Sequence, residues 1–179
     1  MSNLTQIVTN IVAFGTVIAQ IAILFGVYLL ITKKPPRVLT FIQNKAILLS
    51  FLIVLASTLG SFYYSNIAGF QPCVLCWWQR VFLISQLPLL AVALKKKDSL
   101  VLRYTLLLSG IGVAVATYHS YIQYGGAEII PCGTDINSVS CAVRYVFAFN
   151  YITIPLMSLT TFALLIVIAL IHRKATAVN

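Results

Sequence analysis

Charged side chains are scarce in this sequence, and their scarcity excludes a soluble domain. Only 8% of the 179 residues are Asp, Glu, Lys or Arg, whereas 60% are hydrophobic. Soluble domains typically have about 25% charged residues. One stretch of 34 residues, 46–79, has no charged side chain at all. The composition therefore predicts an integral membrane protein.

Apolar runs long enough to cross a bilayer recur along the chain. A helix of about 20 residues spans a hydrocarbon core of about 30 Å. Helices are the expected form, because lipid cannot satisfy the polar groups of an open strand edge. The mostly short connections favour an all-α, up-and-down bundle. The predicted spans are residues 6–31, 45–65, 73–94, 102–124 and 151–171.

The first apolar run lacks the features of a secretory signal. No basic residue precedes it, it has no obvious small-x-small cleavage site, and it is too long. We expect it to remain as a transmembrane helix.

Basic residues are nearly absent from one side of the predicted topology. Ten of the twelve Lys and Arg residues flank the first and third connections or follow the last span, and the positive-inside rule assigns that side to the cytoplasm. These clusters explain the net charge of +9 without a nucleic-acid partner. The ten residues are Lys33, Lys34, Arg37, Lys45, Lys95, Lys96, Lys97, Arg103, Arg173 and Lys174.

All four cysteines lie in the two segments that the charge bias places outside. They form a C-x2-C pair, Cys73 and Cys76, and a C-x8-C pair, Cys132 and Cys141. Outside the cytoplasm thiols are commonly oxidised, so either a redox relay or structural disulfides would fit. A four-cysteine zinc site is a weaker match to this spacing. The spacing alone leaves the three interpretations open.

The surroundings of the first pair favour redox chemistry. Pro72 is typical of a helix start, so Cys73 and Cys76 are expected in a first turn, where the helix dipole lowers thiol pKa values. Arg80 follows on the same face at the membrane boundary. An intramembrane cation is a functional candidate, although an arginine that snorkels to the headgroups is the alternative.

Trp77 and Trp78 follow the cysteine pair directly. They could stack on a planar cofactor or anchor the helix at the membrane interface, as tryptophans commonly do.

The second pair lies in a polar segment, residues 123–150. Pro131, Gly133, Thr134, Asp135, Asn137 and Ser138 all disfavour a regular element. We therefore expect a mobile, accessible loop that carries a disulfide. Electrons could then pass between the two pairs by thiolate attack on a disulfide sulfur.

Three features together resemble one known family. They are the C-V-L-C-W-W-Q-R block at 73–80, the basic turn at 95–98, and Cys141 before a final span. Over residues 45–174 the chain resembles the DsbB disulfide-formation proteins, most closely the short-loop BdbC type of Gram-positive bacteria. The resemblance implies a four-helix enzyme of the bacterial cytoplasmic membrane with its redox loops outside. Such enzymes reoxidise a thioredoxin-like, DsbA-like thiol oxidase and pass electrons to a membrane quinone, either menaquinone or ubiquinone.

The resemblance also implies roles for individual residues. Cys73 and Cys76 would be the quinone-facing pair, with Cys76 nearest the ring and Arg80 supporting quinone binding. Trp77 and His119 are further cofactor-binding candidates, although a histidine solvated at the membrane edge would also fit His119.

In the outer pair, Cys132 resembles the sulfur that the partner oxidase attacks. Cys141 would then form an inter-loop disulfide with Cys73 during the relay.

Three features depart from the family pattern, and one of them is a second loop shorter than that of the long-loop Gram-negative members. Residues 1–38 form an additional transmembrane helix and basic linker before the DsbB-like four-helix domain at 39–179. Gln79 stands where some members have glutamate, which leaves proton delivery to the quinone unassigned.

The alternative functions are a membrane scaffold with structural disulfides and a quinone reductase of the vitamin-K-epoxide type, in which the loop cysteines would precede the C-x-x-C.

Overall fold

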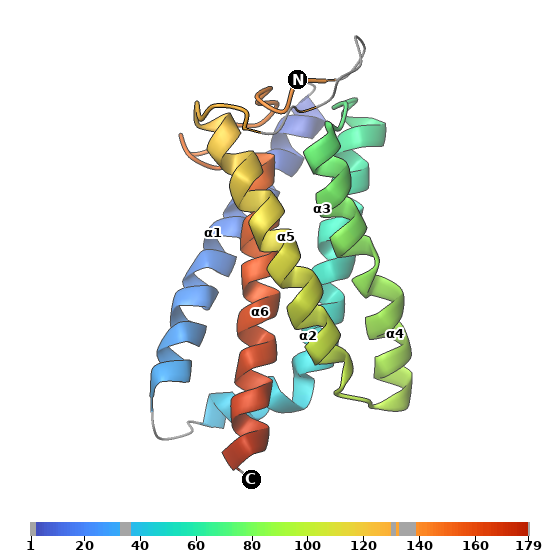
Figure 1. The fold of residues 1–179 in the computed structure, drawn as a ribbon, viewed down its shortest axis with the longest axis vertical. Helices are drawn as coiled ribbons and strands as arrows, with labels where there is room; N and C mark the ends of the chain where they lie inside the picture. Colours follow the sequence, from blue (N-terminus) through green and yellow to red (C-terminus); the bar gives the residue numbers. More distant parts are fainter. Residues whose placement is uncertain (1–2, 33–36, 130–131, 133–138, 179) are drawn as a thin grey trace.

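The computed structural model describes residues 3–32, 37–129, 132 and 139–178. Lys33, Lys34 and the turn-rich residues Pro131, Gly133, Thr134, Asp135, Asn137 and Ser138 lie outside this part. The described part is helical apart from its connections (Figure 1). Its elements are α1 (Asn3–Ile31), α2 (Arg37–Phe62), the π-helical turn η1 (Tyr63–Ile67), α3 (Val74–Ile84), α4 (Gln86–Lys96), α5 (Val101–Gln123) and α6 (Ile154–Val178).

Five segments of these helices are long and apolar enough to cross a membrane, which confirms the predicted all-α fold. The segments are Asn3–Ile31, Phe41–Ile67, Val74–Lys96, Val101–Gln123 and Ile154–Thr176. Each overlaps one predicted span and differs from it by a few residues at the ends. The first of them is α1, the additional helix.

The third span consists of two helices, α3 and α4, that meet at Ser85. Pro88 explains the interruption, since it has no N–H to donate to the carbonyl of Ile84 four residues earlier. Beside this interruption, the side-chain Nε2 of Gln86 donates to the carbonyl of Phe82 at 2.9 Å.

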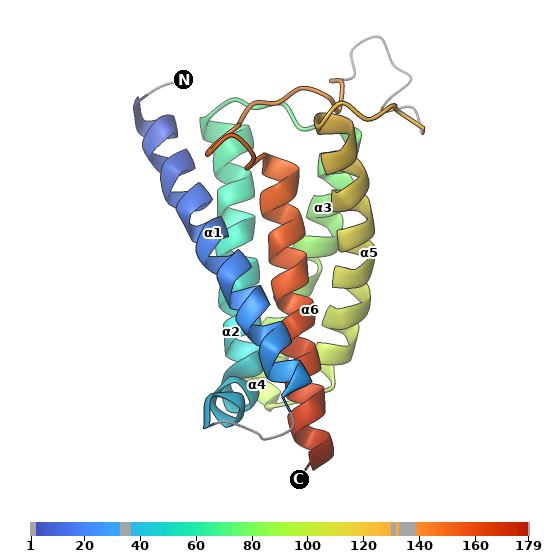
Figure 2. The ribbon, with the colours of Figure 1, turned by 90° about the vertical axis from the view of Figure 1, so that its left-hand side faces the viewer.

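Helix α6 lies at the centre of the bundle, with α1, α2 and α5 around it (Figures 1 and 2). Phe162 and Leu165 of α6 are fully buried in the main apolar cluster, with Val54 of α2 and Ala116 of α5. Gly112 allows α5 to approach closely, because a Cβ there would lie 2.6 Å from the ring of Phe162.

Replacing Gly112 by leucine is expected to destabilise the bundle by about 1–3 kcal/mol, the usual cost of overpacking a filled core. Thermal unfolding in detergent would measure the loss. Gly110→Leu is the matched control, since a Cβ at Gly110 meets nothing within 4 Å. Equal stability of the two variants would contradict the packing described for α5 and α6.

The two ends of the bundle differ in chemistry. The start of α3, the end of α5 and the segment 139–153 gather at one end and carry the cysteines (Figure 1). The end of α4 and the end of α6 lie at the other, with Lys95, Lys96, Arg173 and Lys174. This separation fits the predicted charge bias, with Arg144 as an exception at the cysteine-bearing end.

Candidate redox site

The C-x2-C pair, Cys73 and Cys76, is called the inner pair from here on, and Cys132 and Cys141 the outer pair. The inner pair lies where the chain enters α3. Cys73 is the N-cap residue, with extended backbone angles, and Val74 is the first residue of the helix. Cys76 lies in the first turn, as expected. Pro72 was predicted to begin the helix but precedes the cap instead, because the chain stays extended through Cys73. The two sulfurs, both free thiols, are 3.3 Å apart.

The outer pair forms a disulfide between Cys132 and Cys141. Both residues are buried, with Cys141 only 1% exposed. The prediction of an accessible disulfide is therefore wrong for this state. Ile122 of α5 and Cys73 pack against the two cysteines, and the segment following α5 folds back over the start of α3. The polar loop composition gave no sign of this packing.

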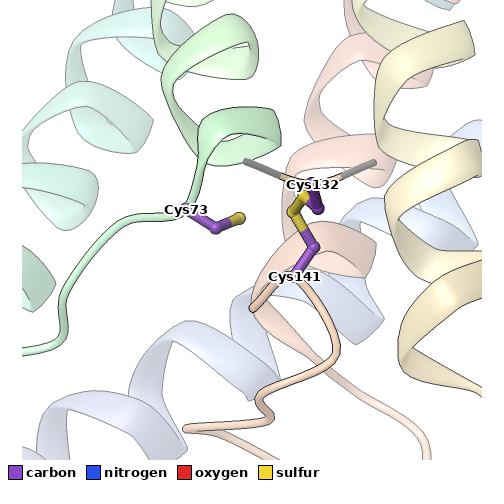
Figure 3. Close-up of side chains that lie close together, drawn as sticks. All are labelled: Cys73, Cys132 and Cys141. Carbon is purple, nitrogen blue, oxygen red and sulfur yellow. A yellow bond between two sulfur atoms is a disulfide. The ribbon is translucent and has the colours of Figure 1, made fainter. Parts of the chain in front are cut away.

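The sulfur of Cys73 lies close to both its own partner, Cys76, and the outer disulfide. Its sulfur and those of Cys132 and Cys141 all lie within 4.8 Å of one another, and its side chain points toward the disulfide (Figure 3). A disulfide bond occupies the two outer sulfurs, so they are not thiolate ligands for a metal in this state. The spacing suits thiol–disulfide exchange instead.

His119 of α5 lies beside this cluster and is fully buried. Its Nε2 is 3.2 Å from the carbonyl oxygen of Cys141 and 3.6 Å from the sulfur of Cys73. A carbonyl can only accept, so Nε2 carries the proton in this arrangement. Nδ1 then accepts from the side-chain amide of Gln79 at 2.9 Å. The imidazole is thus held as a donor toward the reacting sulfurs, and it is not a solvated edge residue.

The pKa of the Cys73 thiol, just before the membrane-spanning helix, is lowered to about 4. The main cause is the hydrogen bond with the sulfur of Cys76, and the hydrogen bond from His119 adds to it, whereas burial acts in the opposite direction. A thiolate is the attacking species in exchange. Cys73 is therefore prepared to attack at neutral pH.

A pH titration of the Cys73 thiolate checks this assignment. Because the pKa is lowered from its ordinary value of 9.0, the thiolate is present above about pH 4 and is lost as the pH falls through that value. Ultraviolet absorbance of the thiolate, as a difference between the wild type and Cys73→Ser, would follow it. His119→Phe should move the midpoint upward, whereas His172→Phe, at the far end of α6, should leave it unchanged. A midpoint near 9 in the wild type would refute the assignment.

Arg80 lies half-buried one helical turn beyond Cys76. Its Nε donates to the hydroxyl of Ser61 at 2.8 Å, and its Nη2 donates to the Ser61 carbonyl at 3.0 Å. These bonds hold the guanidinium between α3 and α2, which differs from a snorkelling arginine.

Trp77 and Trp78 are more than half exposed on the outer surface of α3. The Trp77 ring contacts the Arg80 guanidinium at 5.3 Å from its centroid, but neither tryptophan lines the cavity described next. Their outward position suits interfacial anchors.

A cavity of about 390 Å³ lies below the cysteines. Cys76, Arg80 and His119 form part of its wall. Gln123, 6% exposed, is another polar residue of the wall, and its Oε1 has no partner in the described part of the chain. Aromatic rings close its cysteine end, where Tyr64, Phe70 and Tyr145 stack with centroid separations of 5.7 and 4.8 Å.

Sequence reasoning missed several members of this wall. Ser61, Gln123 and the three stacked rings carry no motif, and only helix packing brings them together. Gln79 was noted because some members of the resembled family have glutamate at this position, but its bond to His119 could not be foreseen.

A free dithiol beside a disulfide, at the end of a helical bundle suited to a membrane, defines a membrane thiol–disulfide exchange protein. Comparison with known families agrees with this class. The family model described as "Disulfide bond formation protein DsbB" matches residues 43–172, and the chain belongs to this family.

Individual relatives extend the comparison. "SPbeta prophage-derived disulfide bond formation protein B" of Bacillus subtilis is 42% identical over 123 residues, which cover 69% of this chain and 82% of the relative. "Disulfide bond formation protein C" of the same organism is 34% identical over 129 residues, 70% of this chain and 91% of the relative. A "Probable disulfide formation protein" of Chlamydia caviae is 37% identical over 123 residues, which cover 68% of this chain and 87% of the relative. No solved structure matches the chain.

Proposed function

We propose that this chain is a thiol:quinone oxidoreductase, which reoxidises a thioredoxin-like, DsbA-like thiol oxidase outside the cytoplasmic membrane and passes the electrons to a membrane quinone. The observation that carries the proposal is the position of the Cys73 sulfur, which lies within exchange distance of both the outer disulfide and Cys76. Family membership supports the disulfide-forming direction.

The outer disulfide would receive the electrons first. A thiolate of the partner attacks Cys132, forms a mixed disulfide and releases the Cys141 sulfur as a thiolate. The second partner thiol then attacks the partner's own sulfur and releases Cys132. The partner leaves with a disulfide, and the outer pair has gained two electrons and two protons as a dithiol.

Internal exchange would then pass the electrons inward. With the inner pair oxidised, the Cys141 thiolate attacks Cys73 and frees Cys76. Cys132 next attacks Cys141, which restores the outer disulfide and releases Cys73. The products are an outer disulfide and two free inner thiols, which is the state of the structure. His119 stabilises the leaving sulfur of Cys73 through its Nε2 proton.

The cavity fits a planar, apolar acceptor with polar oxygens. Stacked aromatic rings form one end, and the Arg80 guanidinium can donate to a quinone oxygen. A quinone, when bound, takes up the two electrons and two protons that the inner dithiol loses as it returns to a disulfide. Both inner cysteines line the cavity, and Cys76 lies one helical turn before Arg80 on α3.

Orientation follows the charge bias. The basic end of the bundle would face the cytoplasm and the cysteine-bearing end the outside of a bacterial cell. That placement would bring the outer disulfide to the side where secreted proteins fold.

Quinone reduction by the purified protein, supplied with a reduced thioredoxin-like oxidase, tests the proposal. The wild type should turn over, and Cys76→Ser and Cys132→Ser should each abolish turnover, because each removes a sulfur from one pair. Ser140→Ala, beside the outer pair, is the control that retains all four sulfurs. Unchanged turnover in the cysteine variants, or no turnover in the wild type with either menaquinone or ubiquinone analogues, would favour a scaffold with structural disulfides.

A further inference from the structure

Helix α1 lies outside the matched family segment, 43–172, and yet it forms part of the cavity wall. Val12, Gly15, Thr16 and Ala19 of α1 all line the cavity. The additional helix is therefore continuous with the candidate redox site, although it carries none of the redox residues.

Specific contacts hold α1 in this place at three levels. At the cysteine end, the hydroxyl of Tyr64 donates to Thr9 at 3.4 Å. Near the middle, Gln20 donates to Thr160 of α6 at 3.4 Å and accepts from Tyr151 at 3.0 Å. At the basic end, Nζ of Lys174 donates to the carbonyls of Leu29, Leu30 and Thr32 at 2.7–3.2 Å.

Close packing supports the same position. Gly26 of α1 faces Val167 of α6, and a Cβ at Gly26 would overlap that side chain. A helix that only tethered the chain to the membrane would not require such a fit. The hydrogen bonds and the close approach together show that α1 is packed specifically against the bundle.

The cavity extends along α1 away from the cysteines. Thr9 is level with Tyr64 at the cysteine end, and Ala19 lies ten residues further along α1, which is about 15 Å at 1.5 Å per residue. Ile53 of α2 lies at a similar depth, and Leu164 of α6 completes this apolar part of the wall. Arg80, His119 and Gln123 are on other helices nearer the cysteines. Hydroxyl groups also line the cavity at Thr16, Thr160 and Thr161, but each of them donates to a backbone carbonyl of its own helix.

Space remains between α1 and α2. A Cβ at Gly15 or at Gly60 would meet nothing within 4 Å, and both glycines line the cavity. Ala19 and Ala56 continue the row of small residues. The space is elongated, with Arg80 and His119 at one end and small residues lining the other. This shape suits a molecule with a polar ring and a long hydrocarbon tail.

We propose that α1 and α2 enclose the isoprenoid tail of the quinone, so that the additional helix converts a lipid-facing site into a covered one. This inference rests on the proposed function. The ring would lie near Cys76 and Arg80, and the tail would run between Gly15 and Gly60 toward the bilayer.

Photolabelling of the full-length protein gives a readout that does not depend on turnover. The probe is a quinone that carries a diazirine on its hydrocarbon tail. We expect labelled residues within 12–19 of α1 on the cavity side, displaced by excess unlabelled tailed quinone. Label confined to the outward-facing Phe14 and Ile18, or to α5, would overturn the proposal and indicate binding to annular lipid sites.

Leucine substitutions test the same space in the working enzyme. Gly15→Leu and Gly60→Leu should raise the apparent KM for a tailed quinone by about fivefold or more, because each blocks the burial of several methylenes. The KM for a tail-less quinone with the same ring should change less than about twofold. Gly110→Leu, which lies outside the cavity, should change neither constant.

The outcomes separate this proposal from the proposed function. Equal effects on both quinones, or no effect on either, would overturn the role of α1 while wild-type turnover still supported quinone reduction. No wild-type turnover with either quinone would count against the proposed function itself, whereas tail labelling on α1 would still locate the ligand.

Discussion

Cys73 and Cys141 should form a disulfide almost completely in a Cys76→Ser, Cys132→Ser double variant. The two sulfurs belong to the group that lies within 4.8 Å, so side-chain rotation can bring them to the bond length of about 2 Å. Cys76→Ser removes the main cause of the low pKa of Cys73, but the hydrogen bond from His119 remains and still favours the attacking thiolate. Mass spectrometry of proteolytic peptides, with and without reductant, would detect the link after treatment with a mild oxidant.

A second double variant serves as its control. Cys73→Ser, Cys132→Ser leaves Cys76 and Cys141, and Cys76 is not a member of the group of three neighbouring sulfurs. This variant should retain most of its free thiols under the same oxidant. Similar cross-linking in both variants would mean that the Cys141 sulfur reaches Cys73 and Cys76 equally well. The proposed order of exchange, in which Cys141 attacks Cys73, would then not hold.

Arg80→Met should lower quinone-dependent turnover by about 100-fold, the scale of losing one preorganised electrostatic group in an apolar site. Arg80 is the one Lys or Arg among the described residues that line the cavity. The variant should also lose the bridge to Ser61, so its thermal stability should be measured alongside its turnover.

Arg103→Met is the matched control, since Arg103 lies at the opposite, basic end of the bundle. It should keep near wild-type turnover. Arg80→Lys should recover only part of the activity, because an ammonium cannot reproduce the forked bonds to Ser61. Full activity in Arg80→Met would mean that Arg80 only joins α3 to α2 and takes no part in quinone reduction.

Much of the fold could be predicted because a bilayer permits few solutions. Apolar run length determines the spans, and only helices satisfy their own backbone within lipid. The inner cysteine pair could be predicted for the same local reason, since a spacing of three residues fixes the position of Cys76 relative to Cys73. These features depend on neighbours in sequence.

The remaining features depend on contacts between distant segments. The burial of Cys141 requires the segment after α5 to fold onto α3, and no local pattern encodes that step. The bond between His119 and Gln79 joins two helices, 40 residues apart. The outward position of Trp77 and the inward position of the aromatic rings at Tyr64, Phe70 and Tyr145 likewise depend on how the helices rotate against one another.

The docking of α1 onto α6 has a consequence for biogenesis. The ribosome makes α1 first and α6 last, and yet Lys174 near the carboxyl end supplies the bonds that satisfy the final carbonyls of α1. During synthesis, α1 must therefore stay in the bilayer without its principal neighbour while the three spans between them insert. Contacts so distant in sequence form late in folding. The wall that α1 provides is thus completed only after α6 has been synthesised, and chains truncated before α6 lack it.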